Sequence, residues 1–157
     1  MNRATIRAAD RTDIEVLQVL MTAYWRHEGL PEPDADRLAT QLQQFLSTPA
    51  YGQGWLALLN DHAVGYLLCT SVYSFEHGGP MAEVDELFVD ADHRGQGIGR
   101  ALLQRVQAYL AERGFVAVQM QVSEHNTLAQ SFWAAQGFLP KAGYRLWLAP
   151  LDAPPRV

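Results

Sequence analysis

Glycine stands at every second position of residues 95–99, and this feature constrains the fold of the chain more than any other. The apolar stretch 82–89 precedes it, and the segment 98–110, with apolar residues at helical spacing, follows directly. The pattern predicts a strand, a glycine-rich loop and a helix in succession. Because glycine has no side chain, successive backbone N–H groups can face one spot, and the helix N-terminus adds positive potential. The loop therefore predicts an anion site, flanked by the cations Arg94 and Arg100.

The loop does not match the two common nucleotide-binding patterns. Its glycine spacing is not the GxGxxG of dinucleotide-binding proteins, and no GK[ST] follows it. The only lysine of the chain, Lys141, lies far downstream, so the loop lacks the phosphate-binding lysine of a Walker-type motif. A flexible strand–helix connection is the alternative interpretation of three glycines taken alone.

Length and composition predict one domain over residues 1–157, with its core at about 5–148 and a loose tail at 150–157. Of the 157 residues 48% are hydrophobic, which is ample for a core, and a net charge of -5 argues against nucleic acid as a partner. No apolar run approaches the roughly 18 residues of a membrane span, and the first residues lack the apolar core of a secretory signal. We therefore expect a cytoplasmic protein with no membrane partner. The single cysteine, Cys69, excludes an internal disulfide and a CxxC metal site.

The remaining periodicities predict an α+β fold. Strands are expected at 4–7, 55–59, 63–73, 82–89, 116–122 and 144–148. Helices are expected at about 14–28, at 38–46, from 98 to just before the glycine at 114, and at 126–136. Residues 74–81, which contain two glycines and a proline, are expected to form a loop.

These features together resemble the GNAT superfamily of acyl-coenzyme A-dependent N-acetyltransferases. The family signature is Arg or Gln, two residues, Gly, one residue, then Gly or Ala, and it falls here on Arg94, Gly97 and Gly99. The strand before the loop and the stretch 126–138 also look like their family counterparts, and the resemblance covers about 5–148. It implies a central mixed, mostly antiparallel sheet flanked by helices, with 82–89 and the next strand splayed apart.

The resemblance further implies that acetyl-CoA is the acyl donor. No metal is expected, because the five histidines are scattered along the chain and show no metal-ligand spacing. The main chains of Leu87 and Val89 would hydrogen-bond the pantetheine arm, and the Leu87 N–H would face the thioester oxygen as an oxyanion donor. The residues implied in donor binding are Leu87, Phe88, Val89, Arg94, Gly95, Gln96, Gly97, Ile98, Gly99, Arg100, Asn126 and Trp133. Asn126 also suits a helix N-cap.

The reaction needs a neutral amine, so a carboxylate or a water chain must take a proton from the substrate ammonium. Glu83 matches the base glutamate of the histone-acetyltransferase branch, and Glu86 matches an acidic residue common in small-amine branches. Strict strand alternation places Glu83 and Asp85 on one face and Glu86 on the other. Glu83 is slightly preferred as the base. The alternative is that these carboxylates only attract a cationic substrate.

The general acid stays unassigned. The family tyrosine that protonates the departing thiolate falls on Trp133, and indole is not an acid near neutral pH. Solvent, Ser131 and Tyr144 are the alternatives. This departure also keeps open a noncatalytic acyl-CoA-binding domain.

The acceptor is expected to be a small cationic amine, because acidic residues crowd the strand and loop from 83 to 92. A peptide or protein amine is the alternative, and the resemblance also allows a homodimer. The residues that stand where the family builds its acceptor pocket are Tyr24, Trp25, Tyr73, Phe75 and Glu76.

Overall fold

A computed structural model describes residues 3–151 of the chain. These residues fall into two compact units with a boundary between Gln121 and Val122, and each unit is described by itself. The first unit contains β1 (Thr5–Ala8), α1 (Ile14–His27), α2 (Ala35–Leu46), β2 (Gly52–Leu59), β3 (His62–Ser74), β4 (Gly79–Val89), α3 (Ile98–Glu112) and β5 (Ala117–Met120). Two short 3-10 turns, Arg11–Asp13 and Ala91–His93, precede α1 and the glycine loop. The second unit contains α4 (Thr127–Ala135).

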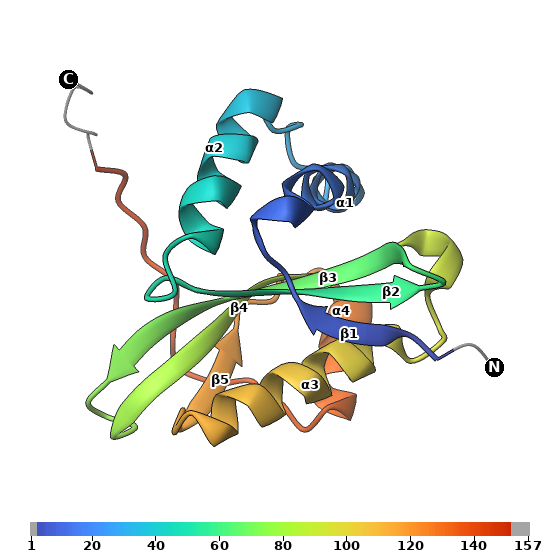
Figure 1. The fold of residues 1–157 in the computed structure, drawn as a ribbon. Helices are drawn as coiled ribbons and strands as arrows, with labels where there is room; N and C mark the ends of the chain where they lie inside the picture. Colours follow the sequence, from blue (N-terminus) through green and yellow to red (C-terminus); the bar gives the residue numbers. More distant parts are fainter. Residues whose placement is uncertain (1–2, 152–157) are drawn as a thin grey trace. The chain divides into compact units, whose positions relative to one another are not determined.

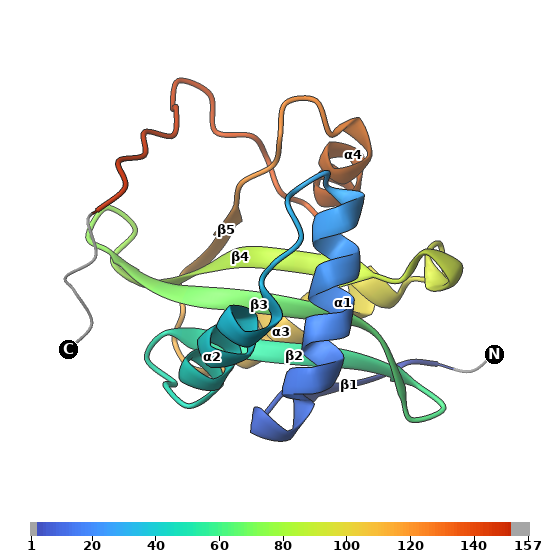
Figure 2. The ribbon, with the colours of Figure 1, turned by 90° about the horizontal axis from the view of Figure 1, so that it is seen from above.

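The five strands form one sheet in the order β1-β2-β3-β4-β5. Neighbouring strands are antiparallel except for β4 and β5, which are parallel. Helices α1 and α2 lie on one face of this sheet and α3 lies on the other (Figures 1 and 2). A mixed, mostly antiparallel sheet flanked by helices confirms the predicted α+β fold class.

Apolar side chains of helices cover both faces of the sheet. On the α1/α2 face, the buried side chains that form one cluster are Ala9, Leu17, Leu20, Met21, Leu38, Leu42, Leu56, Tyr66, Leu68 and Phe88. On the other face, α3 buries Leu102, Leu103, Val106 and Leu110, which recur at helical spacing. Each such side chain contributes about 1.5–3 kcal/mol when fully buried. The strands between the two helical layers, β3 and β4, are therefore fixed from both sides.

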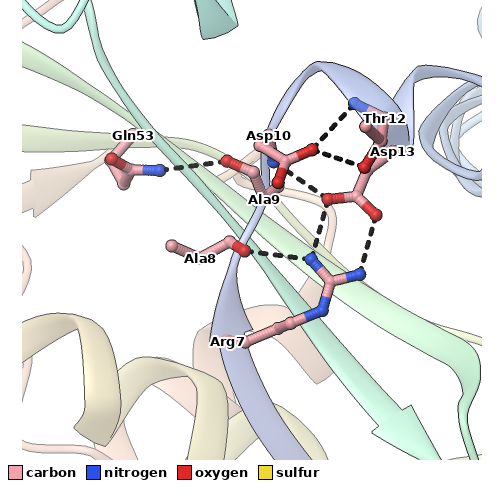
Figure 3. Close-up of polar contacts among 7 residues, drawn as sticks. All are labelled: Arg7, Ala8, Ala9, Asp10, Thr12, Asp13 and Gln53. Carbon is pink, nitrogen blue, oxygen red and sulfur yellow. Dashed lines mark hydrogen bonds and ion pairs between the residues drawn. The ribbon is translucent and has the colours of Figure 1, made fainter.

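The start of α1 is tied to β1 by a charge-assisted cluster (Figure 3). The Arg7 guanidinium donates to both carboxylate oxygens of Asp13, at 2.7 and 2.8 Å. Asp13 in turn accepts from the Asp10 N–H at 2.9 Å, while Asp10 accepts from the Thr12 N–H at 2.8 Å. This reciprocal capping box satisfies N–H groups that a helix start leaves without partners.

Asp13→Asn is expected to lower the free energy of unfolding by about 2 kcal/mol at about pH 7, because it loses charge-assisted hydrogen bonds. The hydrogen bond from Arg7 lowers the pKa of Asp13 in the folded protein. Its stabilisation is therefore present above the unfolded pKa of about 3.9 and is lost as the pH falls through the folded pKa. Urea unfolding of both proteins at about pH 7 and about pH 2 should show the difference shrinking in acid. A pH-independent difference would contradict this account, and Arg11→Gln, in the same turn, is the matched control.

Three predicted elements differ from the structure. The predicted loop 74–81 is a hairpin turn of residues 75–78, because β4 already begins at Gly79 and includes Pro80 near its start, where a proline is tolerated. The predicted strand 116–122 is limited to Ala117–Met120. The predicted strand 144–148 is wrong, since those residues form none. Alternating apolar residues become a strand only where a neighbouring backbone supplies hydrogen bonds.

Candidate active site

The glycine loop adopts the backbone conformation that its sequence predicts. Gly95 and Gly97 have φ of 73° and 78°, in the left-handed region that favours glycine. A Cβ atom built on either residue would meet no atom within 4 Å, so the loop faces open space. The two left-handed residues alternate with residues of ordinary backbone, which is the geometry that turns successive N–H groups toward one spot.

The N-terminus of α3 adds further donors to this loop. Gly97 is the N-cap residue, and no side chain caps the helix. The first helical hydrogen bond is donated by the Ala101 N–H to the Gly97 carbonyl at 2.9 Å. The N–H groups of Ile98, Gly99 and Arg100 precede this bond and have no acceptor within the helix. They are therefore available to donate to a bound anion. Arg100 itself is exposed in the first turn, and so is Gln96 in the loop.

Residues 85–89 of β4 form an open edge of the sheet. β5 runs parallel to β4 only as far as the pair Val84–Met120 and then ends. Within the first unit, residues 85–89 therefore have β3 as their only neighbouring strand. An unpaired edge offers backbone donors and acceptors to an extended ligand.

The backbone groups of Leu87 and Val89 point toward this open edge. The N–H of Asp90 donates to the Val64 carbonyl of β3 at 2.8 Å. Backbone groups alternate sides along a strand, so those of Leu87 and Val89 face away from β3. The Val89 carbonyl accepts from Arg94 Nε at 2.9 Å, and its N–H remains directed to the edge.

Phe88, which was predicted among the donor-binding residues, is oriented differently. Its backbone faces β3, where it pairs with Tyr66, and its side chain is buried on the α1/α2 face. The ring lies 6.0 Å from the Tyr24 ring, and Arg94 lies over it at 5.4 Å. The Phe88 side chain therefore packs against Tyr24 and Arg94, and its backbone does not face the open edge.

A β-bulge corrects the predicted placement of the acidic side chains. Leu68 of β3 lies opposite Glu86 of β4. Two residues further along β3, Thr70 lies opposite Glu83, three residues away on β4. The extra residue is Asp85, which is the bulge. Because opposite residues point to the same face, Glu83 and Glu86 both lie on the α1/α2 face, and the prediction of opposite faces is wrong.

Glu86 is a buried carboxylate held by two aromatic donors. Only 8% of the residue is exposed. Trp25 Nε1 donates to Oε1 at 2.8 Å, and the Tyr66 hydroxyl donates to Oε2 at 2.6 Å. Burial raises the pKa of the Glu86 carboxyl above its usual range, while both hydrogen bonds oppose this shift by stabilising the ionised form. A raised pKa makes this carboxylate a stronger proton acceptor.

Glu83 lies in a more solvated setting on the same face. Gln119 Nε2 of β5 donates to its Oε2 at 2.7 Å. Gln121 Nε2 donates to its Oε1 at 3.4 Å, and both glutamine side chains belong to exposed residues. The site therefore contains two carboxylates on one face, of which only Glu86 is buried.

The structure separates the predicted acceptor residues into two groups. Tyr24 and Trp25, at the end of α1, lie beside Glu86 and Phe88. Burial raises the pKa of Tyr24 to about 12. Tyr73 and Phe75 stack edge to face at the β3–β4 hairpin, with ring centroids 5.3 Å apart and exposed fractions of 67% and 92%.

This second group lies far from the buried carboxylate. Tyr73 pairs with Pro80, and Glu86 lies opposite Leu68, five residues before Tyr73 on β3, which corresponds to about 17 Å along a strand. Glu76 lies in the hairpin turn beside them. The structure therefore brings Tyr24 and Trp25 to Glu86 but leaves the hairpin group at a distance.

Two predicted donor-binding residues belong to the second unit. Asn126 is the N-cap of α4, and its Oδ1 accepts from the Ala129 N–H at 3.0 Å. Trp133 is 9% exposed and packs edge to face against Phe132 and Phe138, each with ring centroids 5.1 Å apart. Both residues thus have structural roles within their unit, and their part in donor binding stays a prediction.

Residues 17–138 match a sequence profile of the acetyltransferase (GNAT) family. This chain belongs to that family. It is an N-acetyltransferase of the GNAT type, and therefore an acyltransferase enzyme. The family assignment disfavours the alternative of a noncatalytic binding domain.

Relatives of this GNAT enzyme differ in how much of their length it covers. An uncharacterised N-acetyltransferase of Archaeoglobus fulgidus is 29% identical over 133 residues, which is 83% of this chain and 90% of the relative. Another from Methanocaldococcus jannaschii is 35% identical over 91 residues, 57% of this chain but only 40% of the relative. An aminoglycoside acetyltransferase from an uncultured soil metagenomic sample, in complex with sisomicin, shares the fold with a TM-score of 0.78 at 23% identity, covering 96% of this chain and 98% of that one.

Residues 3–151 of this GNAT enzyme contain neither a membrane-spanning helix nor a cluster of metal ligands. No helix there is long and apolar enough to cross a membrane. No group of three or more His, Cys, Asp or Glu side chains in the same range could hold a metal ion.

Sequence reasoning missed three side chains that hold the carboxylates. They are Tyr66, Gln119 and Gln121. Tyr66 lies in an apolar strand and has no pattern that marks it as functional. These contacts could have been found only from the register in which β4 pairs with its neighbouring strands. That register includes a bulge, which the alternation of apolar residues does not reveal.

Proposed function

We propose that this GNAT enzyme transfers an acetyl group from acetyl-CoA to a primary amine of a small cationic molecule, by direct attack in a ternary complex. The observation that carries the proposal is the open edge 85–89, which leads through Arg94 into a loop with two left-handed glycines. An extended arm that bears amides can pair with such an edge as an added strand. A pyrophosphate can accept hydrogen bonds from the loop and the helix N-terminus. Both features fit acetyl-CoA.

Acetyl-CoA, when bound, supplies a thioester carbonyl that a neutral amine can attack. The Leu87 N–H points to the open edge and is the group proposed to donate to the carbonyl oxygen as negative charge develops there. A carboxylate on the α1/α2 face, Glu83 or Glu86, is proposed to take the proton from the substrate ammonium. Trp133 supplies no acid, so solvent is proposed to protonate the leaving thiolate.

The preference for a small cationic acceptor rests on charge. Acidic side chains gather along β4 and the following turn, and such a cluster attracts cations and raises their local concentration. Its members are Glu83, Asp85, Glu86, Asp90 and Asp92. A structural neighbour that acts on aminoglycosides, bound to sisomicin, supports a small amine as the acceptor class.

An amine panel tests this function. The full chain is mixed with acetyl-CoA and an aminoglycoside, a polyamine or a lysine-containing peptide, and thiol release is followed colorimetrically. We expect the small polycations to exceed the peptide by at least about ten-fold in kcat/KM, because steering by acidic side chains favours them. Matched alcohols of the same size, which carry a hydroxyl in place of the amine, should release thiol only at the background rate. Tight coenzyme A binding without thiol release from any amine would refute the proposal, and a preference for the peptide would change the acceptor class.

A further inference from the structure

We infer that Trp25 and Tyr66 are positioning residues, which hold the Glu86 carboxylate ready to accept the proton of the acceptor amine. This inference rests on the proposed function and extends it by choosing between Glu83 and Glu86. Trp25 of α1 and Tyr66 of β3 meet at the carboxylate of Glu86 on β4.

The geometry around Glu86 is that of an oriented proton acceptor. Each carboxylate oxygen has one donor, Trp25 Nε1 on Oε1 and the Tyr66 hydroxyl on Oε2. An ionised carboxylate has about four lone-pair sites, so both oxygens can still accept from an ammonium N–H. The two donors fix the orientation of the carboxylate, as second-shell groups do in other catalytic sites.

The position of Glu86 in the strand favours it over Glu83. Glu86 immediately precedes Leu87, whose N–H is the proposed oxyanion donor at the open edge. Glu83 lies three residues earlier, but because of the bulge this is two strand positions, about 7 Å, and its donors are exposed amides. Of the two carboxylates, Glu86 is therefore the nearer along β4 to the Leu87 N–H.

The proton balance follows from these positions. The ammonium of the acceptor gives one proton to a Glu86 oxygen, which leaves a neutral amine with a free electron pair. The amine nitrogen forms the N–C bond to the thioester carbon, and the carbonyl oxygen takes the displaced electron pair as an oxyanion. The oxyanion then collapses, the C–S bond breaks and the sulfur leaves with its electron pair. The nitrogen loses its second proton to solvent, which gives the neutral amide, and solvent protonates the thiolate. Glu86 then returns its proton to solvent before the next turnover.

Glu86 can accept a proton only when it is ionised, so its pKa should set the acid limb of the pH profile of kcat/KM. The groups that face Glu86 determine that pKa. From α1 it faces Trp25 and Tyr24, from β3 Tyr66, and from β4 Asp85. Asp85 and burial disfavour the ionised form, and the two hydrogen bonds favour it. Removing a donor therefore shifts the balance toward the protonated form, in which Glu86 cannot accept a proton.

The test is the pH dependence of kcat/KM in the full chain with the best amine of the panel. Tyr66→Phe should move the acid limb to higher pH by about one unit, which is about ten-fold in rate on that limb. Trp25→Phe should move it in the same direction, and the affinity for coenzyme A should not change. Tyr109→Phe, the same change on the opposite face of the sheet, is the matched control and should not move the limb.

A double-mutant cycle separates positioning from a merely structural role. In a Glu86→Gln background, Tyr66→Phe should have no further effect on the pH profile, because the group it positions is gone. An unmoved acid limb in both single variants would overturn the inference, and so would an undiminished effect of Tyr66→Phe in the Glu86→Gln background. The single-variant profiles do not depend on Glu86→Gln, so they decide the inference if that variant does not fold. If the wild type acetylates no amine, the proposed function itself fails, which is a different outcome.

Discussion

Gly97→Val is expected to weaken coenzyme A binding by at least about 100-fold, which corresponds to about 2.7 kcal/mol. Gly97 has φ of 78°, and a β-branched residue in this left-handed region is strongly disfavoured. The strain should move the loop out of the conformation that turns its N–H groups toward one spot. A side chain would also occupy the open space over the N-terminus of α3, where the Gly97 Cβ position has no neighbour within 4 Å. Isothermal titration calorimetry with coenzyme A measures the change.

The matched control for this variant lies at the other end of the same helix. Gly114 has φ of 76° and also has no neighbour within 4 Å of its Cβ position. Gly114→Val should therefore impose a similar backbone strain, about 1–2 kcal/mol, without touching the loop. We expect similar losses of unfolding free energy in the two variants and a loss of affinity in Gly97→Val alone. Equal affinity losses, or none in Gly97→Val, would disprove the role of the loop.

Leu87→Pro is the second change for which a large effect is expected. Proline lacks the N–H, and this N–H faces the open edge rather than β3, so the β3–β4 ladder keeps its hydrogen bonds. Loss of one oxyanion donor costs about 100- to 1,000-fold in kcat in well-studied enzymes. We expect a decrease of that size in kcat for amine acetylation, with little change in the KM for acetyl-CoA. Steady-state kinetics on the best amine measure both constants.

Leu87→Ala is the control, because it removes the side chain but keeps the N–H. It should retain most of the wild-type kcat. A circular-dichroism melt shows whether Leu87→Pro has kept its fold, and only a folded variant enters the comparison. A folded Leu87→Pro enzyme with wild-type kcat would show that the Leu87 N–H is not the oxyanion donor.

The main elements of the fold could be predicted because their patterns are local. The start of α3 at Ile98 could be predicted because the glycine-rich segment directly precedes it. The apolar face of α3 could be predicted because its apolar residues recur at helical spacing. The predicted strand 144–148 failed for the opposite reason. These residues are mostly apolar, yet Tyr144, Leu146 and Trp147 are 66%, 72% and 88% exposed, since no strand within residues 3–151 pairs with them.

The candidate site could be predicted in its loop but not in its carboxylates. The anion-binding geometry of residues 95–99 is a property of their own backbone, so the sequence contains it. The surroundings of Glu86 depend on Asp85, a single inserted residue that turns Glu83 to the same face. Register is a property of two strands together, so the contact between Glu86 and Tyr66 appears only in the folded chain.

Amide-resolved NMR tests the central claim, that residues 85–89 receive the acyl donor along the open edge. Hydrogen exchange of the backbone amides is measured with and without saturating coenzyme A. The account predicts that exchange slows at Leu87 and Val89, whose N–H groups face the edge, and at the loop amides of Gly95 and Gly97. The Phe88 amide, which faces β3, should be protected in both states. Bound coenzyme A that leaves the exchange of Leu87 and Val89 unchanged would contradict the account.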